Sequence, residues 1–383
     1  MRITEIETLP VSVGPGYEYA VIIVLVRTDE GLTGIGEASL AGQGRGVLGI
    51  LDHFGELLVG QDPGRIEHWW SELVRGTFWS TGQVIMSAVA GIDIALWDLK
   101  GKRLGVPVYD LLGGPTRDRV RVYRHLAGDT AAALVEDAHR WREQGFTALR
   151  FAPLAALDDH SLKHWDPQAS IVATIKATES LRDTLGDEVD LILDAHTMFS
   201  PAESAYLGHA LEPYRLYFYE DPIRPLKPQS LRLVRDKVNL PIATGEQLAH
   251  KWEFQPLIEN ELVDYLRIDM VHAGGITEAK KILAAGELHG QRSALHHASS
   301  PVNGVACLHV DMAVPNFGIQ EWMELEPLYE LFPNAPRAEN GYVVPGPGPG
   351  LGLELDEAEA RRRPSRDAPL PQRYWPDGSV GDY

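Results

Sequence analysis

Three acidic residues stand at a constant interval in the middle of the chain. Asp194, Glu220 and Glu246 are 26 residues apart (220 − 194 = 26 and 246 − 220 = 26), and each closely follows a short apolar run. Such runs are typical of buried parallel strands whose carboxyl ends carry a site. Three converging carboxylates repel one another unless a cation joins them, and all-oxygen ligands suit Mg²⁺ or Mn²⁺. The spacing therefore predicts a divalent-metal site; the alternative is three unrelated acids that cap helices or form surface ion pairs.

The elements that must position these acids alternate between strand and helix. From about residue 119, eight short apolar runs end in polar residues at intervals of about 25 residues, except for one interval of 44. This repeat favours an α/β fold with a closed (β/α)8 barrel over an open doubly wound sheet. The long interval contains an insertion at residues 155–169, which we expect to form a loop over the barrel mouth. The expected strands are residues 121–125, 147–151, 189–194, 216–220, 240–244, 263–269, 291–296 and 317–321.

The first third of the chain has a different pattern. Residues 1–37 alternate as antiparallel strands do, and residues 45–114 are helical, most clearly at 82–102, where apolar residues recur on one face. Glycine and proline residues at 105–115 then mark a boundary. We therefore expect an α+β domain, a barrel domain and a C-terminal segment, at residues 1–117, 118–322 and 323–383.

Composition limits the classes of partner. The net charge of −19 (35 − 54) disfavours nucleic acid and anionic membranes, although a bound metal ion would still admit a small anionic substrate. Cys307 is the single cysteine, which excludes an intrachain disulfide and fits a reducing cytoplasm. Residues 1–7 are alternating and acidic, unlike a signal peptide, and no apolar stretch is long enough to span a bilayer.

The strand ends also supply candidate acid–base groups, because barrel active sites lie at the carboxyl ends of the strands. Asp269 and His296 end adjacent strands, so the carboxylate can fix the imidazole tautomer and make His296 a general base. The alternative is a packed histidine with a structural carboxylate, the role we expect for His297. The complete set of candidates is His125, Arg150, Asp194, His196, Glu220, Glu246, Asp269, His296 and Glu321.

Three of these candidates have less direct interpretations. His196 follows Asp194 by two residues, so in a strand it would face the same cavity, across the mouth from His296. Two acid–base groups on opposite sides of a substrate allow a proton to be removed on one side and given to a leaving group on the other. Arg150 is either a bidentate carboxylate ligand or a barrel ion pair. His125 is either a substrate contact or a hydrogen-bonded core histidine.

Five motifs span most of the chain: residues 91–101 (GIDIALWDLKG), 111–114 (LLGG), 219–222 (YEDP), 244–246 (TGE) and 272–278 (HAGGITE). They resemble motifs of the enolase superfamily, and within it of the acid-sugar dehydratases of the mandelate racemase group. The resemblance implies a (β/α)7β barrel and an α+β capping domain that is completed by the C-terminal segment. It also implies that cap loops near residues 14–19 and 76–82 close over the substrate.

The chain is similar to two subgroups of these dehydratases. The Asp269–His296 pair and His196 are similar to galactonate dehydratases and the racemases. Mannonate dehydratases have a tyrosine base in the loop after strand two, whereas the insertion here contains no tyrosine. Racemases with a lysine base have Lys-x-Lys on strand two, where this chain has Arg150 and Phe151. The similarity to mannonate dehydratases rests on Arg150 and on residues 123–125, 212–216 and 314–321.

The resemblance implies Mg²⁺-dependent dehydration of an aldonate such as mannonate, galactonate or gluconate to a 2-keto-3-deoxy acid, in a homo-oligomer of two to eight subunits. One Mg²⁺ per subunit, on the three regularly spaced acids, would stabilise an enediolate. His296 would take the C2 proton, His196 would protonate the departing 3-hydroxyl and Glu321 would bind the substrate carboxylate. Two alternatives are an epimerase, racemase or cycloisomerase of a related hydroxy acid, and a non-catalytic metal-binding scaffold of the same fold.

Overall fold

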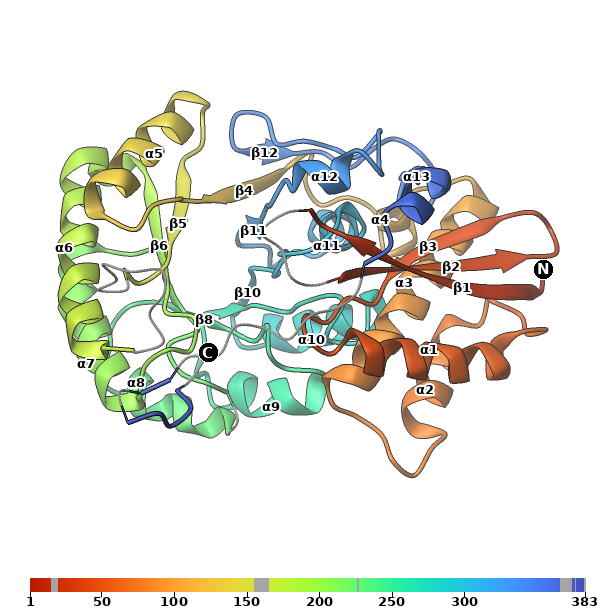
Figure 1. Cartoon of the computed structure of the whole chain (residues 1–383), viewed down its shortest axis with the longest axis horizontal. Helices are drawn as coiled ribbons and strands as arrows, with labels where there is room; N and C mark the ends of the chain where they lie inside the picture. The colour runs from red at the N-terminus through yellow and green to blue at the C-terminus, as the bar shows by residue number, and fades with distance from the viewer. Residues whose placement is uncertain (15–19, 155–164, 226, 366–373, 376, 382–383) are drawn as a thin grey trace.

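The computed structural model of the chain describes residues 1–14, 20–154, 165–225, 227–365, 374–375 and 377–381. Figure 1 shows an antiparallel sheet with its helices, in red and orange, beside a ring of strands and helices that runs from yellow to blue. Most of the expected loop at residues 155–169 and of the cap loop at 14–19 lies outside the described residues, as does much of the tail after residue 365.

The N-terminal part, which we call the cap, consists of three antiparallel strands followed by helices. The strands pair in the order β1–β2–β3. Helix α3 is buried on nearly all sides, so the single apolar face expected for residues 82–102 is only part of its buried surface. The elements are β1 (Ile3–Ser12), β2 (Ala20–Thr28), β3 (Thr33–Glu37), α1 (Gly44–Leu58), α2 (Ile66–Arg75), α3 (Gln83–Leu104) and α4 (Val108–Leu111).

Two glycines allow strand β3 to lie directly on helix α3. A Cβ atom at Gly34 would come within 2.2 Å of the Ala95 carbonyl oxygen, and one at Gly36 within 2.0 Å of the Gly91 carbonyl oxygen. Any larger residue at either position would force the strand away from the helix. The close approach fixes the end of β3, and with it the buried side chain of Glu37.

The second part is a barrel of eight parallel strands in the order β10–β9–β8–β7–β6–β5–β4–β11. A parallel bridge between Ser293 and Phe317 brings the two ends of this order together. All eight expected strands are confirmed, and the open doubly wound sheet is wrong. The strands are β4 (Val120–His125), β5 (Ala148–Phe151), β6 (Asp190–Asp194), β7 (Phe218–Glu220), β8 (Ile242–Thr244), β9 (Tyr265–Leu266), β10 (Arg292–Ser293) and β11 (Gln320–Glu321).

One α-helix follows each of the first seven barrel strands in the described part of the chain, as the (β/α)7β pattern requires. Some strands are shorter than expected: β9 and β10, for example, each have only two paired residues. Their pairing resumes at a bridge between Asp269 and His296, so the ends that carry this pair remain adjacent. The helices are α5 (Ala131–Glu143), α6 (Pro167–Leu185), α7 (Pro201–Leu211), α8 (Arg232–Arg235), α9 (Lys251–Glu259), α10 (Ile276–Glu287) and α11 (Pro301–Ala313).

The C-terminal segment runs back along the barrel to the cap. Its elements are α12 (Glu326–Tyr329), β12 (Tyr342–Val343), which pairs with β4, and α13 (Glu357–Arg362). Glu357 Oε2 on α13 forms an ion pair with Arg27 Nη2 of β2 at 2.7 Å, and Arg361 forms an ion pair with Glu7 of β1. The segment therefore contacts the N-terminal strands. None of the helices described here has both the length and the apolar character needed to cross a bilayer.

Three cap side chains hold the start of barrel helix α10. The indole N–H of Trp70 donates to the Gly274 carbonyl oxygen at 2.8 Å, and that of Trp97 donates to the Thr277 hydroxyl at 2.9 Å. Asp93 Oδ2 accepts the backbone N–H of Thr277 at 3.0 Å. Burial raises the pKa of Asp93 to about 7, more than its hydrogen bonds with Thr277 lower it.

Asp93→Asn is expected to change how the stability of the fold depends on pH. Because the folded-state pKa of Asp93 is raised to about 7 from 3.8, wild-type stability falls as pH rises from about 4 to about 7. Asparagine can still accept the Thr277 N–H and does not ionise. The free energy of unfolding of the variant should therefore rise, relative to that of the wild type, by roughly 2–4 kcal/mol across this pH range. Urea unfolding at pH 5 and pH 8 measures the difference, and equal pH slopes for the two proteins would contradict it.

Candidate active site

The three regularly spaced acids lie at the carboxyl ends of neighbouring barrel strands. Asp194 is directly opposite Glu220 in the β6–β7 register, and Glu220 is opposite Ala243 of β8. Glu246 follows the end of β8 by two residues. The side chains of Asp194 and Glu220 are fully buried, and that of Glu246 is 13% exposed. Strands about 4.8 Å apart place these carboxylates within reach of one another through side-chain rotation alone.

Arg267, which the sequence did not single out, lies at the centre of these acids. Its guanidinium is fully buried, and its Nη2 atom is 2.6 Å from Glu220 Oε1, 3.2 Å from Glu246 Oε2 and 2.9 Å from Glu321 Oε2. Its Nη1 atom donates to the Tyr123 hydroxyl at 2.7 Å. The signal was present in the strand alternation, because residues 267 and 269 face the same side of their strand. A charged residue in that buried run has to meet opposite charges inside the barrel.

A second cation, Arg150, contacts the acid that Arg267 does not, Asp194. Its Nη2 atom forms an ion pair with Asp194 Oδ2, and its Nη1 atom is 3.5 Å from His125 Nδ1. His125 Nε2 donates to Glu321 Oε1 at 2.5 Å. Burial, with Arg150 nearby, lowers the pKa of His125 to about 4, so this histidine is a neutral donor. We call Asp194, Glu220, Glu246 and Glu321 the carboxylate cluster.

The donor set of the carboxylate cluster fits a divalent cation, although its side chains are turned towards the two arginines. In the described part of the chain, no three His, Cys, Asp or Glu side chains stand in ready-made metal-binding geometry. However, Asp194 Oδ2 and both carboxylate oxygens of Glu220 are buried without an aligned hydrogen bond. One cationic nitrogen of Arg267 already touches Glu220 and Glu246 together, so a single positive centre can be shared by these acids.

Charge balance supports the same fit. With all groups ionised, and counted over these described side chains, the cluster and Asp269 supply five negative charges. Arg150, Arg267 and protonated forms of His296 and His196 supply at most four positive charges, which still leaves net negative charge for a cation to offset. Burial is the largest cause of the raised pKa of Glu220, and the negative charges of Glu321 and Glu246 raise it further. Arg267 and Arg150 lower this pKa but do not offset the burial, so Glu220 remains short of compensating positive charge.

The predicted Asp269–His296 pair is present. His296 Nδ1 donates to Asp269 Oδ2 at 2.5 Å, and the backbone N–H groups of Val271 and His272 donate to Asp269 Oδ1 at 2.7 and 3.1 Å. The carboxylate is therefore fixed from both sides, and it orients the imidazole so that Nε2 is 3.4 Å from Glu246 Oε2. Burial lowers the pKa of His296, but Glu246 and its neighbouring carboxylates outweigh this effect and raise it to about 10.

His196 is placed differently from its expected strand position. Strand β6 ends at Asp194, and His196 has a backbone φ of 51°, so it belongs to a left-handed turn and the strand alternation does not apply to it. Its backbone N–H donates to Asp194 Oδ1 at 2.7 Å. Its positive charge is one of those that lower the pKa of Glu246 against the effect of burial, so the ring acts on the carboxylate cluster from this turn.

His297 is separate from the acid–base pair. His297 is buried against Trp322, with ring centroids 5.0 Å apart, and burial lowers its pKa to about 4, consistent with the structural role expected for it.

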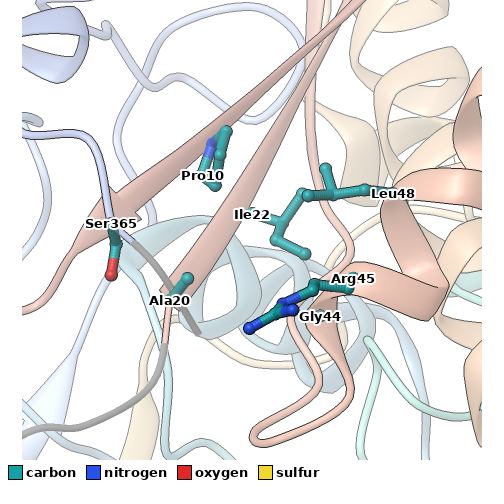
Figure 2. A pocket seen from close by; sticks show the side chains of 7 residues that line it. All are labelled: Pro10, Ala20, Ile22, Gly44, Arg45, Leu48 and Ser365. Atoms are coloured by element: carbon teal, nitrogen blue, oxygen red, sulfur yellow. The ribbon is translucent and has the colours of Figure 1, made fainter. Parts of the chain in front are cut away.

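A cavity of about 370 Å³ lies in the cap between the N-terminal strands and α1. Figure 2 shows its lining residues, none of which is a predicted site residue: Pro10, Ala20, Ile22, Gly44, Arg45, Leu48 and Ser365.

Comparison with known proteins agrees with this architecture. Residues 3–113 match the family model described as "Mandelate racemase / muconate lactonizing enzyme, N-terminal domain", and residues 133–359 match "Enolase C-terminal domain-like". A Caulobacter vibrioides protein named D-mannonate dehydratase is 38% identical over 96% of each chain. A Streptomyces bingchenggensis protein named D-galactonate dehydratase family member is 37% identical over 96% of this chain and 95% of its own.

Solved structures give the same result. A Pantoea ananatis enolase, determined with bound D-gluconate and Mg, superimposes with a TM-score of 0.92 at 34% identity and covers 99% of each chain. A dehydratase-like protein from Zymomonas mobilis superimposes with a TM-score of 0.90 at 30% identity, over 94% of this chain and 98% of its own. The eight-stranded barrel, the antiparallel cap and these matches together show that the chain belongs to the mandelate racemase/muconate lactonizing enzyme family of the enolase superfamily.

Proposed function

We propose that this protein dehydrates a sugar acid, an aldonate such as mannonate, galactonate or gluconate, to a 2-keto-3-deoxy acid, with one Mg²⁺ per subunit as cofactor. The observation that carries the proposal is the His296–Asp269 pair, 2.5 Å apart, beside the carboxylate cluster. The relatives named D-mannonate dehydratase and the structure with bound D-gluconate and Mg support the substrate class. Asp194, Glu220 and Glu246 would hold the Mg²⁺.

In this proposal the acid–base work falls to two histidines. His296 Nε2 takes the proton from C2, since its Nδ1 is occupied by Asp269. It must be neutral to do so, and the pKa of about 10 reflects the carboxylates around it. When bound, Mg²⁺ supplies positive charge that offsets these carboxylates and polarises the carboxylate of the substrate. His196 donates a proton to the departing 3-hydroxyl from its turn beside the carboxylate cluster.

The remaining candidates would bind the substrate. Glu321 is held by Arg267 at 2.9 Å and by His125 at 2.5 Å, so its position is fixed. To donate a hydrogen bond to the substrate carboxylate, Glu321 would carry a proton. Arg150 and His125 border the opposite edge of the carboxylate cluster and would contact substrate oxygens. Arg150 already contacts one carboxylate, that of Asp194, and its guanidinium suits a second.

We also propose the wider organisation of the protein. A cap of residues 1–117, completed by residues 323–383, covers a catalytic barrel of residues 118–322, and the ion pairs between the tail and the first two strands support this division. A homo-oligomer is proposed from the family, and light scattering on the purified protein tests it. A cytoplasmic location is proposed from composition, because the single cysteine is buried and unpaired.

Incubation of the purified protein with Mg²⁺ and a library of aldonates is expected to give a 2-keto-3-deoxy product from at least one of them. Reaction with semicarbazide detects the keto acid, and mass spectrometry shows the loss of one water. Chelation with EDTA should stop the reaction and added Mg²⁺ should restore it, because the cation would offset negative charge of the carboxylate cluster and polarise the carboxylate of the substrate. Inversion at C2 without loss of water would identify an epimerase instead. Full activity after chelation would contradict the metal proposal.

A further inference from the structure

His296, the candidate general base, lies on a loop that is hydrogen-bonded to a side chain of the cap. His296 follows strand β10, and only residues 297–300 separate it from helix α11. Its own backbone N–H donates to the Ile268 carbonyl oxygen at 3.0 Å, which fixes one end of this loop to the segment that follows β9. The other end, at Ser300, meets a side chain from the cap: Glu37, the last residue of β3.

Glu37 is fully buried, and each of its oxygens is hydrogen-bonded at the start of α11. Oε2 accepts the Ser300 hydroxyl at 2.5 Å and the Asn303 backbone N–H at 3.1 Å. Oε1 accepts the Ser39 hydroxyl at 2.6 Å and the Ser300 backbone N–H at 3.5 Å. The carboxylate therefore satisfies two backbone donors that an α-helix leaves unpaired in its first turn.

A displacement at Ser300 would be transmitted to His296 because only four residues lie between His296 and α11, and the ring of His297, the first of them, contacts Ser300. His297 Nε2 contacts the Ser300 carbonyl oxygen at 3.2 Å, and the His297 backbone N–H donates to Glu321 Oε2 at 2.8 Å. Few torsions remain in these four residues to absorb a shift. Movement of the helix start would therefore alter the alignment of His296 with Asp269 and with the carboxylate cluster.

We propose that Glu37 is a positioning residue for the general base: it connects the packing of the cap on the barrel to the geometry of the His296–Asp269 pair. The inference rests on the proposed function, in which His296 is the base. It goes beyond that function because it assigns a role to a cap residue that contacts none of the reacting groups. Gly34 and Gly36 have a part in it, since they let β3 lie on α3 and so deliver Glu37 to the loop.

Glutamine cannot replace this carboxylate without loss. The two backbone N–H groups, of Ser300 and Asn303, donate to different oxygens of Glu37. Whichever way the amide of glutamine turns, its NH₂ group faces one of these donors, whereas the serine hydroxyls can reverse. Glu37→Gln should therefore displace the start of α11, while Glu37→Asp keeps two acceptor oxygens.

Glu37→Gln is expected to lower kcat for dehydration and the rate of C2-proton exchange by about 10- to 100-fold, the effect of a misplacement of about 1 Å. KM should stay within about threefold of wild type, because the substrate-binding groups on the other strands are unmoved. The far-downfield proton NMR signal of His296 Nδ1–H, assigned by its absence in His296→Asn, should weaken or shift. Glu37→Asp should recover part of both kcat and this signal.

The matched control is Glu278→Gln, the same change at another fully buried glutamate. Glu278 accepts the backbone N–H and the ammonium group of Lys251 and does not touch the loop of His296. It should retain the wild-type kcat and the wild-type proton signal even if stability falls. The inference is overturned if Glu37→Gln keeps both kcat and the signal, or if Glu278→Gln loses both equally. If Glu37→Gln does not fold, a Glu37→Asp protein indistinguishable from wild type in both readouts overturns it.

These outcomes are distinguishable from failure of the proposed function. If the wild type dehydrates no aldonate, the function fails, but the NMR comparison of Glu37→Gln with Glu278→Gln still shows whether Glu37 controls the His296–Asp269 hydrogen bond. If the wild type is active and the signal is insensitive to Glu37, the positioning role fails and the function stands.

Discussion

His296→Asn is expected to abolish exchange of the C2 proton of the substrate with solvent deuterium, and dehydration with it. The rate should fall by roughly 10²–10⁴-fold or more, the usual contribution of a general base. The geometry gives the reason: Asp269 occupies Nδ1 at 2.5 Å and leaves Nε2 towards the carboxylate cluster, and asparagine has no ring nitrogen to accept the proton. Proton NMR of the substrate in D₂O measures exchange separately from loss of water.

Two further variants decide whether the loss is specific. Asp269→Asn should reduce exchange less completely, because the imidazole remains but loses the carboxylate that orients it and holds its tautomer. His309→Asn removes another buried histidine, which accepts from Tyr109 and donates to Leu351 away from the strand ends, and should keep its activity. Normal C2-proton exchange in His296→Asn would place the base elsewhere.

The regular features of the fold could be predicted from the sequence. The 26-residue spacing of the strand-end acids reflects one strand and one helix per barrel unit, so it gave the adjacency of Asp194 and Glu220 that the register confirms. The adjacency of Asp269 and His296 followed from the same logic, and their bridge confirms it. In each case a period in the sequence maps directly onto neighbouring strands.

What the sequence did not reveal depends on side chains that meet from distant segments. Arg267 lies two residues before Asp269, so a search limited to the last polar residue of each strand does not find it. Its guanidinium nevertheless contacts three members of the carboxylate cluster. The contact of Glu37 with Ser300 spans 263 residues, and no local pattern encodes it. The turn at His196 was also missed, because strand alternation says nothing about where a strand stops.

The turn at His196 allows the side chain to be replaced by asparagine without a change of backbone conformation. Asparagine tolerates the left-handed conformation that His196 adopts at φ 51°, and it keeps the backbone N–H that donates to Asp194 Oδ1. His196→Asn should therefore preserve the turn and the position of Asp194 while removing the ionisable ring. The variant isolates the chemistry of the side chain from its structural surroundings.

His196→Asn is expected to lower the rate of water loss by roughly 10²–10⁴-fold, because the 3-hydroxyl is a poor leaving group unless it is protonated. Exchange of the C2 proton should persist in part, because His296 and Asp269 are untouched and proton removal precedes departure of the hydroxyl. The two rates, measured in one D₂O experiment by the C2 proton signal and by keto-acid formation, should separate.

His125→Asn provides the comparison for this uncoupling. His125 donates to Glu321 at 2.5 Å, and its loss should disturb substrate binding, so that exchange and dehydration fall together. Proportional losses in His196→Asn as well would show that His196 binds the substrate or supports the turn and is not the acid. Uncoupling in His196→Asn alone would assign the leaving-group proton to it, since an epimerase has no departing hydroxyl whose rate could separate from exchange.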